Sequence, residues 1–320
     1  LIACVLSMKY NVLYTEGNLN NHIGVPLTLL KISDKHEIAI IEMGANHQGE
    51  IAQLSAIALP SHGFLTNIGK AHLEGFGGIE GVIKGKTELY QHLINHDGVV
   101  WINSANPILA NMIHRFKAPL LYPLSGDFYH CEFIDADPNV RIKTESGTVV
   151  ETQLVGAYNF ENIAVALCIG KYFQVDAADA EQAIAAYNPT NNRSQIVKKG
   201  SNTIILDAYN ANPTSMLSAL ENLSRMEGDD KIVILGDMKE LGEDSRDEHA
   251  KIGEYLNSAG FTQVFLFGPE MTAAAQEVES LHFTDKQELM NAIREENFAN
   301  TLMLIKGSRS MGLEAVAEVV

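Results

Sequence analysis

The spacing of hydrophobic residues predicts that short strands and helices alternate in the first part of the chain. Four short runs are rich in β-branched residues, and between them apolar residues recur about every 3.6 positions, as on one face of a helix. The predicted strands are Asn11–Tyr14, Glu37–Met43, Gly63–Thr66 and Gly98–Ile102, and the predicted helices are Ile23–Leu30, Ile51–Leu59, Val82–Leu93 and Ile108–Phe116. This alternation predicts a parallel sheet covered by helices.

The pattern changes after residue 130. Turn sequences at Asp137-Pro138 and Ser146-Gly147 separate short runs that we expect to form antiparallel strands. These strands are Cys131–Ile134, Val140–Thr144 and Val149–Leu154, and the helices expected after them are Asn159–Tyr172 and Ala177–Ala186.

A turn-rich polar sequence over residues 188–192 marks the predicted domain boundary. Beyond it we expect strands at Thr203–Asp207, Lys231–Leu235, Gln263–Phe267 and Thr301–Ile305. The predicted fold class is α/β. A central parallel-sheet domain with a small antiparallel insertion covers residues 1–187, and a Rossmann-like α/β domain covers residues 188–320. The length of 320 residues agrees with two domains of roughly 150 residues each.

Composition narrows the class of protein. The chain has 23 basic and 40 acidic residues, a formal net charge of −17. This excess disfavours nucleic-acid binding, which depends on basic faces, but it permits phosphate ligands held by local lysines and backbone amides. We expect no membrane partner, because no apolar run approaches the ~20 residues that a spanning helix requires. The cysteines Cys4, Cys131 and Cys168 lie in apolar neighbourhoods, which favours free thiols and a cytoplasmic location.

Polar residues follow two neighbouring predicted strands of the first domain. Glu42 lies at the end of the second predicted strand, and His72 follows the third. A carboxylate at the end of a parallel strand is where nucleotide enzymes hold Mg²⁺. For either residue alone, the structural interpretation is favoured. Their occurrence after neighbouring strands leaves the functional and structural interpretations equally open.

Two glycine-rich segments imitate nucleotide-binding motifs without completing them. Glu80 occupies the position where a dinucleotide fingerprint starting at Gly75, and also a P-loop ending at Lys86, would need glycine. Apolar residues around Lys86 instead place that lysine within a helix.

Further candidates lie at a helix start and after a strand of the second domain. Asn159 and Asn162 are three residues apart, so both amides can share one helix face and contact a purine edge, although Asn159 could equally be a helix cap. Asp207 closes a predicted strand, where it could bind a ribose hydroxyl or cap the following helix.

Six segments in this order resemble the Mur ligase family: Thr15–Thr28, Glu42–Asn46, Asn67–His72, Asp207–Pro213, Gly236–Gly242 and Lys306–Arg309. The fourth and fifth are typical of the member that adds D-alanyl-D-alanine to UDP-N-acetylmuramoyl-tripeptide. The resemblance implies an ATP-dependent amide ligase of peptidoglycan precursor synthesis, in which ATP phosphorylates a carboxylate and an amine attacks the acyl phosphate. Its implied partners are ATP and these two substrates, and we expect a monomer.

The resemblance also implies roles for individual residues. It makes Glu42 and His72 ligands of Mg²⁺, and Lys86 a lysine that CO₂ converts to a Mg²⁺-binding carbamate, so that Lys86 and His72 are the expected catalytic residues. The ATP-binding residues it implies are Asn159 and Asn162 near adenine, Arg193 at phosphate and Asp207 at ribose. The implied substrate residues are Asn18, Asn20, Asn21, Asn210, Asn212, Lys306 and Arg309.

The family pattern also has a domain for the UDP-sugar peptide and a Walker A loop, neither of which occurs in this sequence. We therefore expect a chain truncated before Leu1 that by itself neither binds ATP stably nor ligates. Two alternatives stay open: a ligase that adds glutamate to folate, and a non-catalytic remnant that only binds ligand or partner. The Asp207–Pro213 segment favours the first interpretation over the folate type.

Overall fold

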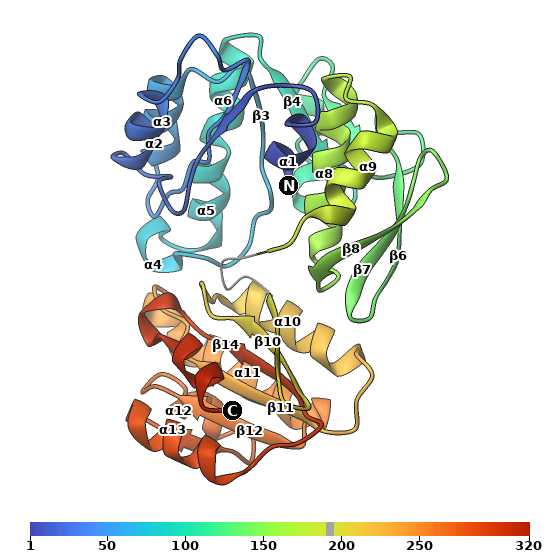
Figure 1. The fold of residues 1–320 in the computed structure, drawn as a ribbon. Helices are drawn as coiled ribbons and strands as arrows, with labels where there is room; N and C mark the ends of the chain where they lie inside the picture. Colours follow the sequence, from blue (N-terminus) through green and yellow to red (C-terminus); the bar gives the residue numbers. More distant parts are fainter. Residues whose placement is uncertain (190–194) are drawn as a thin grey trace. The chain divides into compact units, whose positions relative to one another are not determined.

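The computed structural model describes residues 1–189 and 195–320, which form two structural units (Figure 1). Unit 1 consists of Leu1–Asp135, Arg141–Gln153 and Tyr158–Tyr187. Unit 2 consists of Ala136–Val140, Leu154–Ala157 and Asn188–Val320.

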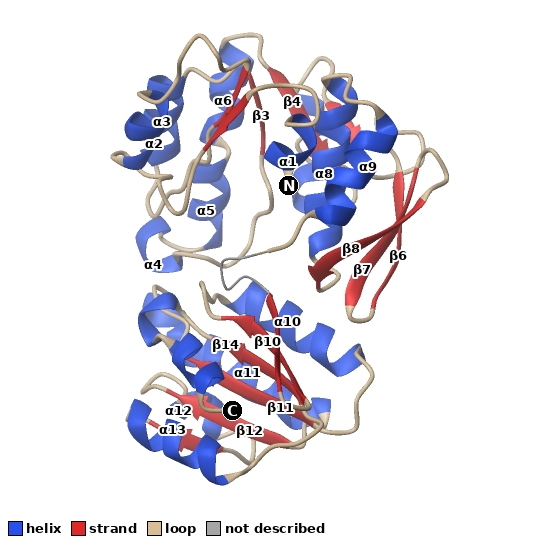
Figure 2. Cartoon of the chain, viewed as in Figure 1, coloured by secondary structure: helices blue, strands red, loops and turns tan. Residues whose placement is uncertain are grey.

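Strands β1 to β5 of unit 1 are short and parallel, as the alternation predicted. Strand β1 (Val12–Tyr14) pairs with β2 (Ile38–Ile40), and β4 (Val99–Asn103) lies between β3 (His62–Phe64) and β5 (Leu120–Tyr122). Figure 2 labels β3 and β4 among the strands. Side chains that follow β2, β3 and β4 therefore leave the carboxyl ends of parallel strands, where ligands of α/β sheets bind.

Helices of three to fourteen residues connect these strands. They are α1 (Ile2–Leu6), α2 (Gly24–Leu29), α3 (Glu50–Ala58), α4 (Leu73–Phe76), α5 (Ile79–Lys86), α6 (Glu88–Asn95), α7 (Pro107–Ala110), a 3₁₀ turn at Ile113–Arg115, α8 (Asn159–Tyr172) and α9 (Ala177–Ala186). The central helix is α8, in which eight consecutive residues are buried because α1, α9, β4 and β5 pack around it. Gly170 of α8 permits this packing, since a Cβ there would lie 2.6 Å from Val5 Cγ1.

Two predicted helices of unit 1 are wrong in extent. The predicted helix Val82–Leu93 is two helices that meet at Thr87, whose hydroxyl donates to the Lys84 carbonyl at 3.0 Å. Such a side-chain bond competes with the helical backbone pattern. The predicted helix Ile108–Phe116 is α7, capped by the Asn106 side chain, followed by the separate 3₁₀ turn.

The glycines beside Lys86 have a packing role. Gly81 and Gly85 lie one turn apart on α5, and both face Phe76 of α4. A Cβ on Gly85 would approach the Phe76 ring to 2.5 Å, and one on Gly81 would approach the Phe76 carbonyl oxygen to 1.9 Å. Close helix contact, rather than a phosphate loop, therefore explains the Gly-Lys-Thr sequence.

The insertion is a three-stranded sheet in the order β6 (Cys131–Ala136), β7 (Asn139–Thr144) and β8 (Val149–Val155). Two residues connect β6 to β7, and a connection that short joins only antiparallel strands. Burial alternates along β7, where Val140, Ile142 and Thr144 are buried, so one face of this small sheet is covered.

Unit 2 is built on a six-stranded sheet. Its order is β13 (Leu281–Phe283), β12 (Gln263–Phe267), β11 (Lys231–Gly236), β14 (Leu302–Lys306), β10 (Asn202–Asp207) and β9 (Gln195–Lys199). All strands are parallel except β9, which is antiparallel to β10. The α/β fold class is thereby confirmed, whereas β5, β9 and β13 had no predicted counterpart.

Strand β14 is buried at every position, which shows that both faces of this sheet are covered. Helices provide that cover, as is usual for parallel sheets. The helices are α10 (Pro213–Arg225), α11 (Ser245–Ala259), α12 (Thr272–Ala275) and α13 (Lys286–Glu295), with 3₁₀ turns at Gly242–Asp244, Arg309–Met311 and Leu313–Glu318. One core layer joins Ile204, Ile234 and Phe265 of the strands to Leu289 of α13 and Val316 of the last turn. Within residues 1–189 and 195–320, no helix has the length and apolar character needed to cross a membrane.

Candidate functional site

The first predicted metal ligand lies beside a predicted substrate residue. Glu42 follows β2 and is exposed, and its Oε1 accepts a hydrogen bond from Asn20 Nδ2 at 2.8 Å. Its backbone N–H donates to Thr15 Oγ1 at 2.9 Å. Gly44 allows this arrangement, because a Cβ there would lie 2.8 Å from the Asn20 amide. The structure thus joins the Asn20 loop to the Glu42 loop.

The other asparagines of the Asn20 loop have different roles. Asn21 Oδ1 accepts the backbone N–H groups of Ile23 and Gly24 at 3.1 and 2.9 Å, so Asn21 caps the start of α2. Asn18 is exposed, and its carbonyl accepts the N–H of Asn20 at 2.8 Å. These three hydrogen bonds, donated by the backbone N–H groups of Ile23, Gly24 and Asn20, give the loop a defined shape around Asn20.

The loop after β3 carries His72 and receives Lys86. His72 is half-buried at the start of α4 and has a positive φ of 54°, a backbone conformation that is uncommon for any residue but glycine. Lys86 Nζ donates to the carbonyl of Asn67, in the same loop, at 3.1 Å. Burial lowers the pKa of the Lys86 amine. The structure therefore brings Lys86 to the loop of His72.

Glu88, two residues after Lys86, bonds to the start of α3. Its two carboxylate oxygens accept the N–H groups of Gly49 and Ala52 at the start of α3, at 2.6 and 2.9 Å. This caps a helix N-terminus with a negative charge. Among the described residues, no group of three or more His, Cys, Asp and Glu side chains is arranged to hold a metal ion.

The two predicted adenine-side asparagines do share one helix face. Asn162 Nδ2 donates to Asn159 Oδ1 at 3.1 Å in the first turn of α8. Glu161 lies between them in sequence, and burial raises the pKa of its carboxyl group. Asn103, the last residue of β4, is fully buried, and its Oδ1 accepts the backbone N–H of Ala105 at 3.0 Å. Arg193, the predicted phosphate contact, lies outside the described residues.

In unit 2, the strand-end acid Asp207 meets a lysine from the neighbouring strand. The register of β10 and β14 pairs Asp207 with Lys306, and Lys306 Nζ donates to Asp207 Oδ2 at 2.5 Å and to the Asn210 carbonyl at 3.2 Å. Lys306 is 1% exposed and Asp207 13% exposed. Lys306 thus bonds to Asp207 and to the loop that follows it. A contact of Lys306 with a substrate stays a prediction.

The loop after Asp207 contains the other predicted substrate residues. Asn212, not Asp207, caps α10: its side chain accepts the N–H of Ser215 at 2.9 Å, and Ser215 Oγ accepts the N–H of Asn212. Asn210 is exposed, and its Oδ1 accepts the N–H of Ala211. The exposed guanidinium of Arg309 lies 5.0 Å from the centre of the Tyr209 ring, within the range of a cation–π contact.

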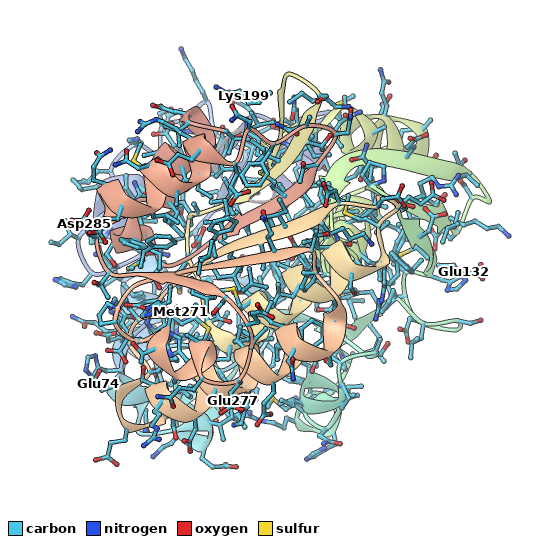
Figure 3. All side chains as sticks on the ribbon, turned by 90° about the horizontal axis from the view of Figure 1, so that it is seen from below. Glu74, Glu132, Lys199, Met271, Glu277 and Asp285 are labelled. Atoms are coloured by element: carbon cyan, nitrogen blue, oxygen red, sulfur yellow. The ribbon has the colours of Figure 1, made fainter. Side chains whose placement is uncertain are left out.

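Sequence reasoning assigned no role to Asp237, the residue after β11. Asp237 is fully buried; its Oδ1 accepts the N–H of Met271, which Figure 3 labels, and its Oδ2 accepts Lys239 Nζ at 2.8 Å. Its carbonyl accepts the N–H of Ser308 at 3.1 Å. The signal in the sequence was an acid directly after a strand with the apolar run Ile232–Leu235, where a buried charge needs partners.

Comparison with protein families and curated proteins gives one consistent result. A model of the Mur ligase middle domain matches residues 1–170, and a model described as Mur ligase, glutamate ligase domain, matches residues 192–309. The chain is 34% identical to the UDP-N-acetylmuramoyl-tripeptide–D-alanyl-D-alanine ligase of Escherichia coli, over all of this chain and 73% of that protein. It is 32% identical to the Bacillus subtilis ligase of the same name, over 99% and 72% respectively.

Solved structures agree with the sequence comparison. A crystal structure of MurF from Acinetobacter baumannii superposes with a TM-score of 0.88 at 30% identity, over 99% of this chain and 72% of that chain. The MurF ligase from Thermotoga maritima in complex with ADP gives a TM-score of 0.87 at 27% identity, over 99% and 75%.

Proposed function

This chain belongs to the Mur ligase family, and on that basis we propose that the gene product containing it performs the ATP-dependent ligation of D-alanyl-D-alanine to UDP-N-acetylmuramoyl-tripeptide. The observation that carries the proposal is the identity of 32–34% to ligases of that name along essentially the whole chain. It also outweighs the folate-type alternative, since the relatives at this identity carry the peptidoglycan name.

The proposed reaction has two steps. The terminal carboxylate of the tripeptide attacks the γ-phosphorus of ATP, which forms an acyl phosphate and releases ADP. The neutral amine of D-alanyl-D-alanine then attacks the acyl carbon; the C–O bond breaks, inorganic phosphate leaves and the amine loses a proton. The protein's contribution is to hold the three reactants in line and to stabilise the negative charge on the phosphoryl oxygens.

Unit 1 is proposed to supply the metal side of this site. Glu42 and His72 would hold Mg²⁺, together with Lys86 once CO₂ has converted its amine to a carbamate. An amine must be neutral to react with CO₂, and the lowered pKa of Lys86 favours that form. Mg²⁺ takes one or two protein carboxylates together with substrate phosphates, so it needs no ready-made cluster of ligands. When bound, the ion polarises the phosphoryl oxygens.

The remaining predicted residues divide between ATP and the two peptides. Asn159 and Asn162 would recognise adenine with the amide face at the start of α8, and Asp207 would bind the ribose, with Arg193 at the phosphates. Asn18, Asn20 and Asn21 would face the muramoyl peptide. For D-alanyl-D-alanine we propose the loops of unit 2 with Asn210, Asn212, Lys306 and Arg309, in which Arg309 offers an exposed cation to a carboxylate.

The test is a ligation assay on the gene product that contains residues 1–320. ATP, Mg²⁺, UDP-N-acetylmuramoyl-tripeptide and D-alanyl-D-alanine should yield ADP, phosphate and the pentapeptide product, detected by mass spectrometry. Omission of D-alanyl-D-alanine, or its replacement by L-alanyl-L-alanine or by glutamate, is the control. ADP release that is faster with glutamate and a folate than with the dipeptide would contradict the proposal.

We also propose that the protein acts in the cytoplasm as a monomer. ATP and the nucleotide-linked substrate occur there, and the three cysteines are free thiols, which fits a reducing compartment. Light scattering at micromolar concentration measures the mass directly. A mass of twice the chain or more would contradict the monomer.

A further inference from the structure

A buried histidine lies directly behind the loop that follows β11. His249 on α11 is fully buried, and none of the roles proposed above involves it. Its Nε2 accepts the backbone N–H of Met238 at 3.0 Å, and its Nδ1 lies 2.7 Å from the carbonyl oxygen of Ser245. Because a carbonyl can only accept, the proton resides on Nδ1 and Nε2 presents its lone pair. The geometry therefore requires a neutral imidazole in one tautomer.

The neighbours of Met238 in this loop are fixed by other elements. The Asp237 carboxylate is bound by the N–H of Met271 and by Lys239 Nζ, and the Lys239 N–H donates to Ser308 Oγ at 2.9 Å. Three successive residues, 237 to 239, are thus each tied to a different part of unit 2. His249 holds the middle residue, Met238, by accepting its backbone N–H.

The loop ends in a cation at the carboxyl edge of the sheet. The Lys239 side chain is 41% exposed, and the N–H of Lys239 is bonded to Ser308, the residue before Arg309. Strand β11, which precedes Lys239, is paired in the sheet with β14, which precedes Arg309. Ligands of such sheets bind at this edge. The position of Lys239 therefore depends on the conformation that the Met238 amide bond stabilises.

We propose that His249 is a positioning residue for the ligase reaction: its neutral imidazole fixes Met238, and so holds Lys239 in the place where unit 2 receives D-alanyl-D-alanine. The inference rests on the proposed function. Protonation would place an N–H on Nε2 against the N–H of Met238, and two donors cannot bond to each other. The loop is then released, and productive binding of the dipeptide declines.

The groups around the imidazole set the pH at which this occurs. Asp237 and Lys239 face His249 from the β11 loop, and Glu270 faces it from the segment after β12, where Ser245 Oγ donates to Glu270 Oε2 at 2.8 Å. Burial lowers the pKa of His249, while the Ser245 carbonyl and the two carboxylates oppose that shift. His249 is consequently neutral at pH 7, and the release occurs on the acid side of the ordinary histidine pKa.

Two variants of similar size separate positioning from packing. His249→Gln keeps an acceptor, its Oε1, at about the distance of Nε2 and cannot be protonated in this pH range. His249→Leu fills the same space without an acceptor. Hydrogen exchange of the Met238 amide at pH 7 is the first measurement, with the Val233 amide in β11 as internal reference. We expect exchange of Met238 relative to Val233 to rise roughly tenfold in His249→Leu, the loss of one ordinary hydrogen bond, and to stay near wild type in His249→Gln.

The second measurement is the pH profile of kcat/KM for D-alanyl-D-alanine. Wild type should lose activity as pH falls through the lowered pKa of His249, His249→Gln should lack that acid limb, and His249→Leu should raise KM at every pH. Equal acceleration of Met238 and Val233 exchange in His249→Leu, or an unchanged acid limb in His249→Gln, would overturn the proposal. If wild type does not ligate at all, the proposed function fails, and the exchange ratios still decide whether His249 fixes the loop.

Discussion

The two units present polar side chains at the carboxyl ends of their strands in different ways. In unit 2, Lys306, Asp237 and His249 are at most 1% exposed, and each is bonded to a residue from another element. In unit 1, Glu42 is exposed and Lys86 half-buried, and each side chain makes one hydrogen bond within the described residues.

The difference follows from the cost of burying charge. A buried ion is tolerated only with partners of good geometry, so the edge of unit 2 must be complete before any ligand arrives. Exposed charges carry no such requirement. Unit 1 therefore leaves its charged groups accessible to solvent and ligands, whereas the charged groups of unit 2 form a fixed frame.

The largest effect is expected when the buried pair of unit 2 is broken. Lys306→Leu removes the buried cation that bonds to the mostly buried Asp207 carboxylate, so the free energy of unfolding should fall by about 3–5 kcal/mol. Urea unfolding measures it. The matched control in unit 1 is Lys31→Leu, which breaks a 2.7 Å pair with Glu16 whose members are 48% and 65% exposed, and should leave the free energy of unfolding nearly unchanged because solvent screens the pair. Equal losses would refute the contrast.

In unit 1 we expect the opposite balance, a large effect of a charged residue on activity and a small effect on stability. Lys86→Ala should lower kcat of ligation by about a hundredfold, as expected when one preorganised charge is lost, but lower the free energy of unfolding by only about 1 kcal/mol. Short-chain carboxylic acids should restore part of the activity if a carbamate is the native group. Lys84→Ala, an exposed lysine on the same helix, is the control. Full activity of Lys86→Ala would remove this residue from the site.

Away from the edge, unit 1 contains a close helix contact at Gly85. Gly85→Ala places a Cβ 2.5 Å from the buried Phe76 ring, and overpacking of this kind costs about 1–3 kcal/mol against a gain of roughly 1 kcal/mol in helix propensity. We expect a small net loss of stability in thermal unfolding. Phe76→Leu should make room, so the double variant should lose less than the sum of the two single variants. Strict additivity would contradict the contact.

The smallest effect concerns pH. His62 stacks on Trp101 at 5.5 Å and lies 3.2 Å from the Tyr172 hydroxyl, and burial lowers its pKa. The unfolded chain then binds the proton more readily, so stability is full above the ordinary histidine pKa and declines as pH falls. His62→Phe should reduce that decline between pH 7 and 5, measured against the same variant at pH 8. An unchanged slope would show that His62 does not contribute to it.

Local features of the fold were predictable where an element is long or well capped. Helices α8 and α9 begin and end at the predicted residues, and α9 starts after Asp176, whose side chain accepts the N–H of Ala178. Strands β5 and β13 were missed. Like β1, β2 and β3 they have only three residues, so a period of two does not distinguish them from a loop. The break at Thr87 was missed because apolar periodicity continues through it, while the competing bond comes from one hydroxyl.

In the candidate site, too, local features were predictable from the sequence and contacts between distant residues were not. The sequence determined that Glu42 and Asp207 follow or end strands, and that Asn159 and Asn162 share a helix face, since these facts depend on neighbours a few residues away. Only the tertiary structure decided which partners meet. Asp207 and Lys306 are 99 residues apart, and Asp237 meets Ser308, because the last strand, β14, inserts between β11 and β10. Strand order is set by crossover connections and by burial of both faces of the sheet, so no local pattern contains it.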